Sequence, residues 1–140
     1  MSTLAAAVRS DLDAVVAGFV SWMETGVPPE GLVADDCFAD VTAPHWRIQV
    51  HGGPAVIASR RESHPFTGSV RVEDVARTER GFAIAFEERW EDQGQQWYCR
   101  EQMTAELRDG QITEIRYYCT GDWDEARQAA HAAEVELLRP

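Results

Sequence analysis

The sequence predicts an α+β domain in which a cone-shaped, curved antiparallel β-sheet wraps around N-terminal helices and is followed by a C-terminal helix. Apolar residues recur every three or four positions at the start of the chain, as in an amphipathic helix. From Gly68 onward they alternate with polar residues, as in strands that bury one face. The 140 residues, 44% hydrophobic and 26% charged, fit one compact unit, so 1–140 is treated as a single domain.

The first half of the chain is expected to contain two main helices. An apolar stripe predicts the first helix, which ends at Gly26 and the Pro28-Pro29 pair because both interrupt helical geometry. The second helix should run over 55–64 and stop before Pro65. The stripe of the first helix comprises Leu4, Val8, Leu12, Val15, Val16, Phe19, Val20 and Met23.

Strands are expected wherever period-two runs are bounded by turn residues. Good hairpin turns occur at Arg80-Gly81, Gln93-Gly94 and Asp109-Gly110. Asp122, with an acid three residues later, is a capping-box variant that should open an Ala-rich C-terminal helix reaching to about 138. The expected elements are a helical turn at 30–34 and strands at 37–43, 46–51, around 70–72, around 82–86, at 96–107 and at 112–120.

The turns set the pairing of the last strands and so decide which side chains face inward. A two-residue turn at Gln93-Gly94 pairs apolar with apolar residues, setting Trp90 against Trp97, Glu88 against Cys99 and Phe86 against Glu101. For the last hairpin, a three-residue loop with Gly110 in the left-handed conformation avoids mixing polar with apolar residues. It sets Met103 against Ile115, Glu101 against Tyr117 and Cys99 against Cys119. The other face is polar and suits solvent or a wet subunit interface.

Composition excludes several classes of partner and cofactor. The net charge is −11, so phosphate backbones and anionic lipid should repel the chain, and neither nucleic acid nor a membrane is an expected partner. No apolar run is long enough to span a bilayer, and the N-terminus does not resemble a signal peptide. Three widely spaced cysteines favour a reducing cytoplasm over a disulfide scaffold or a zinc site. No phosphate loop or metal-ligand motif is present, so we expect no cofactor and no metal.

The order of elements resembles the nuclear transport factor 2-like superfamily, in particular its SnoaL-like and ketosteroid isomerase-like branch. Two segments carry the resemblance: 32–40 (LVADDCFAD) and 107–118 (LRDGQITEIRYY). The resemblance implies a conical pocket, acid/base chemistry without a cofactor, and a homodimer. The chain departs from the family at two catalytic positions. Val41 occupies the place of the isomerase-like base, with Asp40 one residue early and on the opposite face, and Tyr117 follows Arg116 where an acid is usual.

Four residues are candidates for proton transfer. Glu101 falls on the apolar face, where a carboxyl group has a raised pKa suited to a general acid or base. Tyr117 can hydrogen-bond to Glu101 or to a substrate oxyanion, and Glu88 lies one pair further out on the same face. His45 flanks the second strand, and histidine is a residue type that suits proton transfer. The alternatives are a wet Glu101 at a strand end, a Glu88 paired with an arginine at the sheet edge, and surface positions for His45 and His51.

Apolar and aromatic side chains are candidates for binding a flat substrate, with ordinary core packing as the alternative. Asp40 pairing with Arg47 is preferred to a catalytic role. Two packed thiols at Cys99 and Cys119 are preferred to a bridge. The candidate substrate-binding residues are Trp90, Trp97, Phe86, Met103, Ile115, Cys99, Cys119, Trp22 and Asp40.

Two functions remain open at this point. The first is a cofactor-independent enzyme of SnoaL-like type that cyclises, isomerises or dehydrates a hydrophobic, cyclic, polyketide-like molecule. The second is a non-catalytic small-molecule-binding or assembly domain, dimerising through the polar sheet face that bears Arg100, Arg116 and Tyr118.

Overall fold

The computed structural model describes the backbone of residues 3–139 and the side chains of residues 11–139. Within that part of the chain three helices and six strands form. None of these helices combines the length and apolar character that crossing a bilayer requires. In chain order the elements are α1 (Thr3–Thr25), β1 (Val33–Ala43), β2 (Trp46–His51), α2 (Gly53–Ser63), β3 (Gly68–Arg77), β4 (Gly81–Asp92), β5 (Gln95–Arg108), β6 (Gln111–Cys119) and α3 (Glu125–Glu134).

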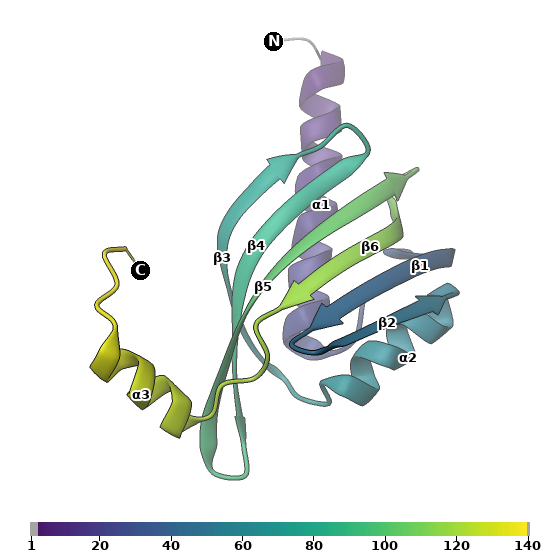
Figure 1. Cartoon of the computed structure of the whole chain (residues 1–140). Coiled ribbons are helices and arrows are strands. Elements are labelled where there is room, and N and C mark those ends of the chain that lie inside the picture. Colours follow the sequence, from purple (N-terminus) through teal and green to yellow (C-terminus); the bar gives the residue numbers. More distant parts are fainter. Residues whose placement is uncertain (1–2, 140) are drawn as a thin grey trace.

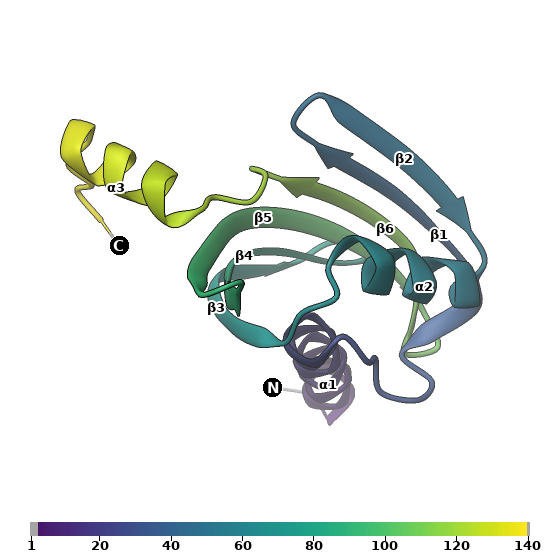
Figure 2. The same cartoon turned by 90° about the horizontal axis from the view of Figure 1, so that it is seen from below.

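The six strands form one curved sheet in the order β2-β1-β6-β5-β4-β3. The sheet wraps around α1 and α2, and α3 projects away from the body (Figures 1 and 2). This α+β cone confirms the predicted fold class. One pairing departs from the antiparallel expectation, because β1 and β6 run parallel. β6 completes a meander of four strands, β3 to β6, and lies beside β1, which has β2 on its other edge.

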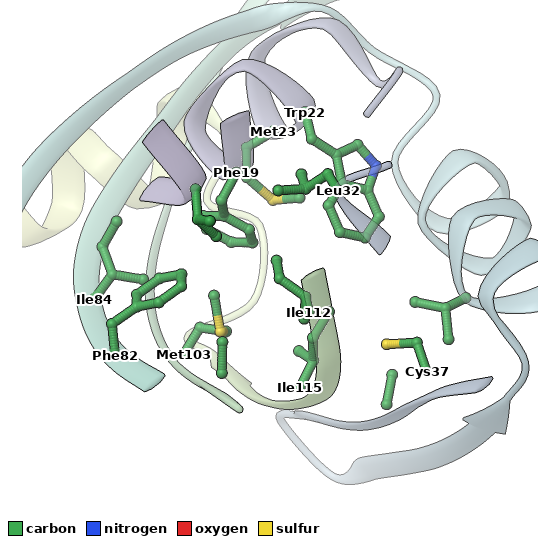
Figure 3. Packing of buried hydrophobic residues seen from close by; sticks show 14 of the residues in the cluster. Phe19, Trp22, Met23, Leu32, Cys37, Phe82, Ile84, Met103, Ile112 and Ile115 are labelled. Atoms are coloured by element: carbon green, nitrogen blue, oxygen red, sulfur yellow. The ribbon is translucent and has the colours of Figure 1, made fainter. Parts of the chain in front are cut away.

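The core lies between the concave face of the sheet and α1. Gly26 ends α1 as predicted, with φ of 79° and its N–H donating to the carbonyl of Trp22 at 2.8 Å. Leu4 and Val8 of the predicted stripe lie outside the residues whose side chains are described. Figure 3 shows the α1 side chains meeting those of the sheet, and the buried residues it labels are Phe19, Trp22, Met23, Leu32, Cys37, Phe82, Ile84, Met103, Ile112 and Ile115.

The predicted register of β4 and β5 is confirmed at each pair: Trp90 faces Trp97, and Phe86 faces Glu101. The predicted register of β5 and β6 is wrong. Asp109 and Gly110, with φ of 53° and 78°, form a two-residue turn in place of the expected three-residue loop. The extra residue is Thr113, a bulge in β6 that breaks the pairing between Glu106 and Leu107.

The error in register is two residues, because Met103 faces Tyr117 where Ile115 was expected. Glu101 accordingly faces Cys119. A shift of two residues keeps every side chain on its face, whereas a shift of one would have reversed them all. The predicted inner and outer faces are therefore correct, whereas the predicted pairs of facing residues between β5 and β6 are wrong.

Two expected helical segments differ from the prediction. Residues 30–34 form a turn and the start of β1, because Gly31 has φ of 81° and the carbonyl of Leu32 accepts from Ile112 in β6 at 2.8 Å. The N-cap of α3 is Asp124, whose side chain accepts from Arg127 N–H at 2.8 Å, and not Asp122. Two backbone hydrogen bonds between Trp123 and Tyr98 keep the preceding segment extended. α3 ends at Glu134, short of the predicted 138, and buries none of its residues.

Candidate functional site

A cavity of about 260 Å³ lies between α1, α2 and the strands β1, β2 and β6. Most of its wall is apolar, with polar groups from Arg60, Tyr117 and two serines. Figure 2 shows α2 lying across this end of the sheet with α1 beside it. Apolar walls with a few placed polar groups are typical of a small-molecule site. The lining residues are Phe19, Trp22, Met23, Ala39, Val41, Ala43, Trp46, Ile48, Val56, Ser59, Arg60, Ser63, Ile115 and Tyr117.

The close contact of α2 with β1 brings Arg60 to this cavity. Gly53 at the start of α2 allows the approach, since a Cβ there would lie 2.4 Å from the carbonyl oxygen of Ala34. One turn from the end of α2, Arg60 donates through Nη1 and Nη2 to Glu88 of β4, at 3.2 and 2.5 Å. The side chains of this pair are 12% and 4% exposed, so the ion pair is shielded from water. Such a pair is strongly coupled, because each partner left alone would be a buried charge.

Glu88 and Glu101 form a buried carboxyl pair on the inner face of β4 and β5. Their residues are 3% and 4% exposed, and the register places them diagonally, with Glu88 facing Cys99 and Phe86 facing Glu101. Burial raises the pKa of Glu101 well above its usual value, and the hydrogen bond and negative charge of Glu88 raise that pKa further. Oε1 of Glu101 accepts from Cys99 Sγ at 2.5 Å, while Oε2 has no donor within reach. Burial and the lack of a donor at Oε2 both disfavour the charged form of Glu101.

Glu88 carries the negative charge of the pair. Burial alone would raise its pKa, but the hydrogen bond with Glu101 and the charge of Arg60 outweigh burial and leave that pKa below the usual value. The hydroxyl of Tyr117 donates to Oε2 of Glu88 at 3.5 Å. Tyr117 also lines the cavity. A chain of contacts therefore runs from the cavity wall through Tyr117 to Glu88 and on to Glu101.

His64 is a further member of the site that the sequence did not single out. It is 8% exposed, lies edge-on to Phe66 and Trp90, and places Nε2 3.8 Å from Glu88 Oε1. Burial and the charge of Arg60 lower the pKa of His64 to about 4 against the opposing effect of Glu88. Arg60 was missed as well. The one available signal was the spacing of four between Arg60 and His64, which puts both on one face of a helix.

The structure brings together only part of the predicted site. Tyr117, Ile115 and Trp22 line the cavity. Glu101 is not among the lining residues and reaches the cavity only through Glu88 and Tyr117, where direct exposure to a substrate had been expected. Tyr117 contacts Glu88 and not Glu101, because of the bulge in β6.

Several other predicted residues lie away from the cavity. Phe86 and Met103 are fully buried in the core, and Trp90 stacks on Trp97 beside His64 with ring centroids 6.5 Å apart. The burial of Phe86 and Met103 and the stacking of the two tryptophans favour the alternative of core packing for these four residues.

The polar candidates near the first hairpin also face away. His45 is exposed in the turn between β1 and β2, with φ of 61°, and His51 is exposed as well. Asp40 is on the opposite face from Val41 and is hydrogen-bonded to Arg47, with Nε to Oδ1 at 2.9 Å. That bond holds the pKa of Asp40 down at about 2. The expected structural pair of Asp40 and Arg47 is thus present, and neither Asp40 nor His45 reaches the cavity.

Cys99 of β5 and Cys119 of β6 are free thiols near Glu101. One ligand-type atom each from Cys99, Glu101 and Cys119 lies within 4.8 Å of the others. Metals bind the thiolate form, but the hydrogen bond with Cys119 and burial raise the pKa of Cys99 strongly. The same hydrogen bond lowers the pKa of Cys119, so the thiolate is disfavoured at Cys99 alone. The absence of a metal stays a prediction.

Comparison with known proteins gives a structural likeness without a close relative in sequence. No family model matches the chain, and no curated protein matches it significantly. IdmH, a putative polyketide cyclase from Streptomyces antibioticus, superimposes with a TM-score of 0.64 at 15% identity, over 86% of this chain and 97% of that one. A Catenulispora acidiphila protein described as having a ketosteroid isomerase-like fold gives 0.62 at 11% identity, over 87% and 97%. The chain therefore has a ketosteroid isomerase-like fold, which is the fold that the resemblance in the sequence predicted.

A third solved structure with this fold is an LEH-like epoxide hydrolase from M. tuberculosis, with a TM-score of 0.62 at 13% identity over 79% of this chain and 83% of that one. The named activities of these neighbours differ from one another, so the ketosteroid isomerase-like fold does not decide between reactions. The chemistry has to be argued from the cavity and the groups behind it.

Proposed function

We propose that the protein is a cofactor-independent enzyme that cyclises, isomerises or dehydrates a hydrophobic, cyclic, polyketide-like molecule by acid/base catalysis. The observation that carries the proposal is the placement of Tyr117 between an apolar cavity and two buried carboxyl groups whose pKa values are shifted in opposite directions. The polyketide cyclase among the structural neighbours supports this class of substrate. Two carboxyl groups held in different protonation states are the usual means of running acid and base steps at one pH.

In the proposed mechanism Tyr117 is the group that touches the substrate. Its hydroxyl donates to Glu88, so the phenol oxygen takes a proton from a carbon next to a substrate carbonyl as its own proton moves to Glu88. The reverse transfer returns a proton to the rearranged product. Glu101 acts through Glu88, because its bound proton keeps the carboxyl pair at a single negative charge. His45, which was expected to assist, has no part in this scheme.

A non-catalytic domain that binds a small molecule is the second candidate. It is favoured by the ion pair with Arg60, which already occupies both oxygens of Glu88. A carboxylate held in this way has a lowered pKa and is a weaker base.

The two candidate functions can be distinguished by measuring whether the protein accelerates the exchange of hydrogen bound to carbon. Enolisation is shared by the three proposed reactions when the substrate carries a carbonyl, and 1-tetralone is a bicyclic ketone of suitable type. In deuterium oxide the wild-type protein should accelerate deuterium incorporation next to the carbonyl, measured by mass spectrometry. Tyr117→Phe and Glu88→Gln should lower that rate by about 100-fold or more, the usual contribution of acid/base catalysis.

The control for this experiment is Asp40→Asn, which alters a charged pair on the opposite face of β1 and should leave the exchange rate unchanged. Binding of 1-tetralone without any acceleration would reject catalysis and favour the binding domain. Equal loss of rate in Asp40→Asn would show that the effect of Tyr117→Phe is not local to the cavity.

We also propose a cytoplasmic homodimer formed through the outer face of the sheet. The face carries Arg100, Arg116 and Tyr118, and Tyr118 is 57% exposed. Aromatic and arginine side chains are enriched in protein interfaces. Three free thiols among the described residues support a reducing compartment.

A further inference from the structure

Cys99 and Cys119 are free thiols on neighbouring strands, and their sulfur atoms lie within 4.8 Å of each other. Glu101 faces Cys119 in the register of β5 and β6, so Cys99 is the diagonal neighbour of Cys119. The Cα atoms of diagonal neighbours on antiparallel strands are about 7–8 Å apart, slightly more than the roughly 4.4–6.8 Å that a disulfide spans. A bond between the two sulfurs therefore requires a small movement of one strand.

The end of β6 has the freedom to make that movement. β6 ends at Cys119, and its pairing with β1 ends one residue earlier, at Tyr118. Beyond this point the N–H of Arg100 donates to the side-chain oxygen of Thr120 at 3.0 Å, and not to a backbone carbonyl. Gly121 then has φ of 84°, a left-handed conformation that ends the extended chain. Cys119 is thus held by the ladder on the β5 side alone.

The two thiols differ in accessibility and in how readily each loses its proton. Cys119 is partly exposed, whereas Cys99 is buried. The hydrogen bond with Cys99 and the N–H of Gly121, which donates to Sγ of Cys119 at 3.3 Å, lower the pKa of Cys119 against the opposing effects of burial and nearby carboxylates. The thiolate is the form that reacts with oxidants. An oxidant from solution therefore meets Cys119 first, with Cys99 beside it as a second thiol.

We propose that Cys99 and Cys119 form a reversible disulfide within one chain when the protein meets a hydroperoxide. The thiolate of Cys119 attacks one oxygen of hydrogen peroxide, the O–O bond breaks, and hydroxide leaves, which gives a sulfenic acid. The sulfur of Cys99 then attacks the sulfenic sulfur. The S–S bond forms, the S–O bond breaks, and the oxygen leaves as water with the proton of Cys99. Two thiols lose two electrons in all, and the peroxide becomes two molecules of water.

The disulfide also acts on the buried carboxyl group of Glu101. Sγ of Cys99 donates to Oε1 of Glu101 at 2.5 Å, and this bond lowers the pKa of Glu101 against burial. A disulfide has no S–H to donate, so oxidation should raise the pKa of Glu101 further. Because diagonal Cα atoms lie beyond the usual span, the bond is strained and readily reduced. Two molecules of a thiol such as glutathione return both cysteines and leave as their own disulfide.

The test treats the wild-type protein with equimolar hydrogen peroxide and follows its intact mass and its free thiols. We expect a loss of about 2 Da, the two hydrogens removed when a disulfide forms. Free thiols should fall from three to one, and dithiothreitol should reverse both changes. After digestion with trypsin under non-reducing conditions, the peptide 90–100, which contains Cys99, should be joined to the peptide 117–127, which contains Cys119.

Cys37→Ala is the matched control. Cys37 is fully buried, and burial raises its pKa to about 11, so this variant should form the disulfide as the wild type does. Cys119→Ala should keep both of its thiols under the same treatment. An unchanged mass, a gain of oxygen without the loss of two hydrogens, a disulfide between two chains, or a bridge to Cys37 would overturn the proposal. The peptide map of the wild type requires neither variant to fold, and none of these results bears on the proposed function.

Discussion

Replacing Arg60 with methionine should destabilise the folded protein by about 3–5 kcal/mol at pH 8, the usual result of leaving one partner of a buried ion pair alone. The variant removes both hydrogen bonds to Glu88, at 3.2 and 2.5 Å, and the counter-charge of a carboxylate whose side chain is 4% exposed. For a domain of 140 residues this corresponds to a fall in melting temperature of roughly 10–15 °C.

The loss should depend on pH in a defined direction. Without Arg60 the pKa of Glu88 rises, so Glu88 takes up a proton as pH falls and the buried charge disappears. The difference between wild type and Arg60→Met should therefore shrink between pH 8 and pH 5. The double variant Arg60→Met with Glu88→Gln, which removes both charges, should recover much of the stability.

The matched control is Arg61→Met, one residue along α2, where the side chain is exposed. Its effect should stay within about 0.5 kcal/mol, as for ordinary surface substitutions. Urea unfolding monitored by tryptophan fluorescence measures all three variants. An equal loss in Arg60→Met and Arg61→Met, or a loss that does not change with pH, would refute the assignment of a buried ion pair.

Three further predictions concern the same site and the outer face. His64 is neutral in the folded state, with a pKa of about 4 against 6.5 when unfolded, so the wild type should lose about 3 kcal/mol as pH falls from 6.5 to 4. His64→Gln should lack that contribution in urea unfolding. The contribution of Glu101 to stability depends on pH in the opposite direction. Its pKa is raised in the folded state, so its protonation stabilises the fold at low pH, and this stabilisation is lost as pH rises above 4.5. Glu101→Gln should flatten this decline, and an identical slope in the variant would exclude a protonated Glu101. Sedimentation at micromolar concentration should give a dimer of the 15.7 kDa chain and a monomer for Tyr118→Glu, and a monomeric wild type would reject the proposed interface.

The part of the site that lies within one hairpin could be predicted from the sequence. Alternation of apolar and polar residues, together with the Gln93-Gly94 turn, placed Glu88 and Glu101 on the inner face, and both are buried there. A pattern with a period of two is insensitive to a shift of two. The alternation of apolar and polar residues therefore could not reveal the bulge at Thr113, and Tyr117 was assigned to the wrong carboxyl group.

Contacts between elements far apart in the sequence could not be predicted in the same way. Arg60 meets Glu88 across 28 positions, because α2 packs against β1 and reaches over the concave face. No local pattern encodes that approach, so Arg60 and His64 were missed. His45 is different: alternation already favoured a surface position, Pro44 alone kept a role in the site open, and the tight turn between β1 and β2 leaves His45 exposed.

The protonation state of Glu101 is the most direct test of the account, because the carboxyl pair behind Tyr117 depends on it. Carboxyl carbon resonances of a protein labelled at glutamate can be followed from pH 3 to pH 9, with Glu101 assigned by its absence in Glu101→Gln. We predict one glutamate signal, missing in that variant, that stays in the protonated position at pH 7. A Glu101 signal that titrates with the surface glutamates, near the ordinary value of 4.5, would contradict the buried proton and the mechanism built on it.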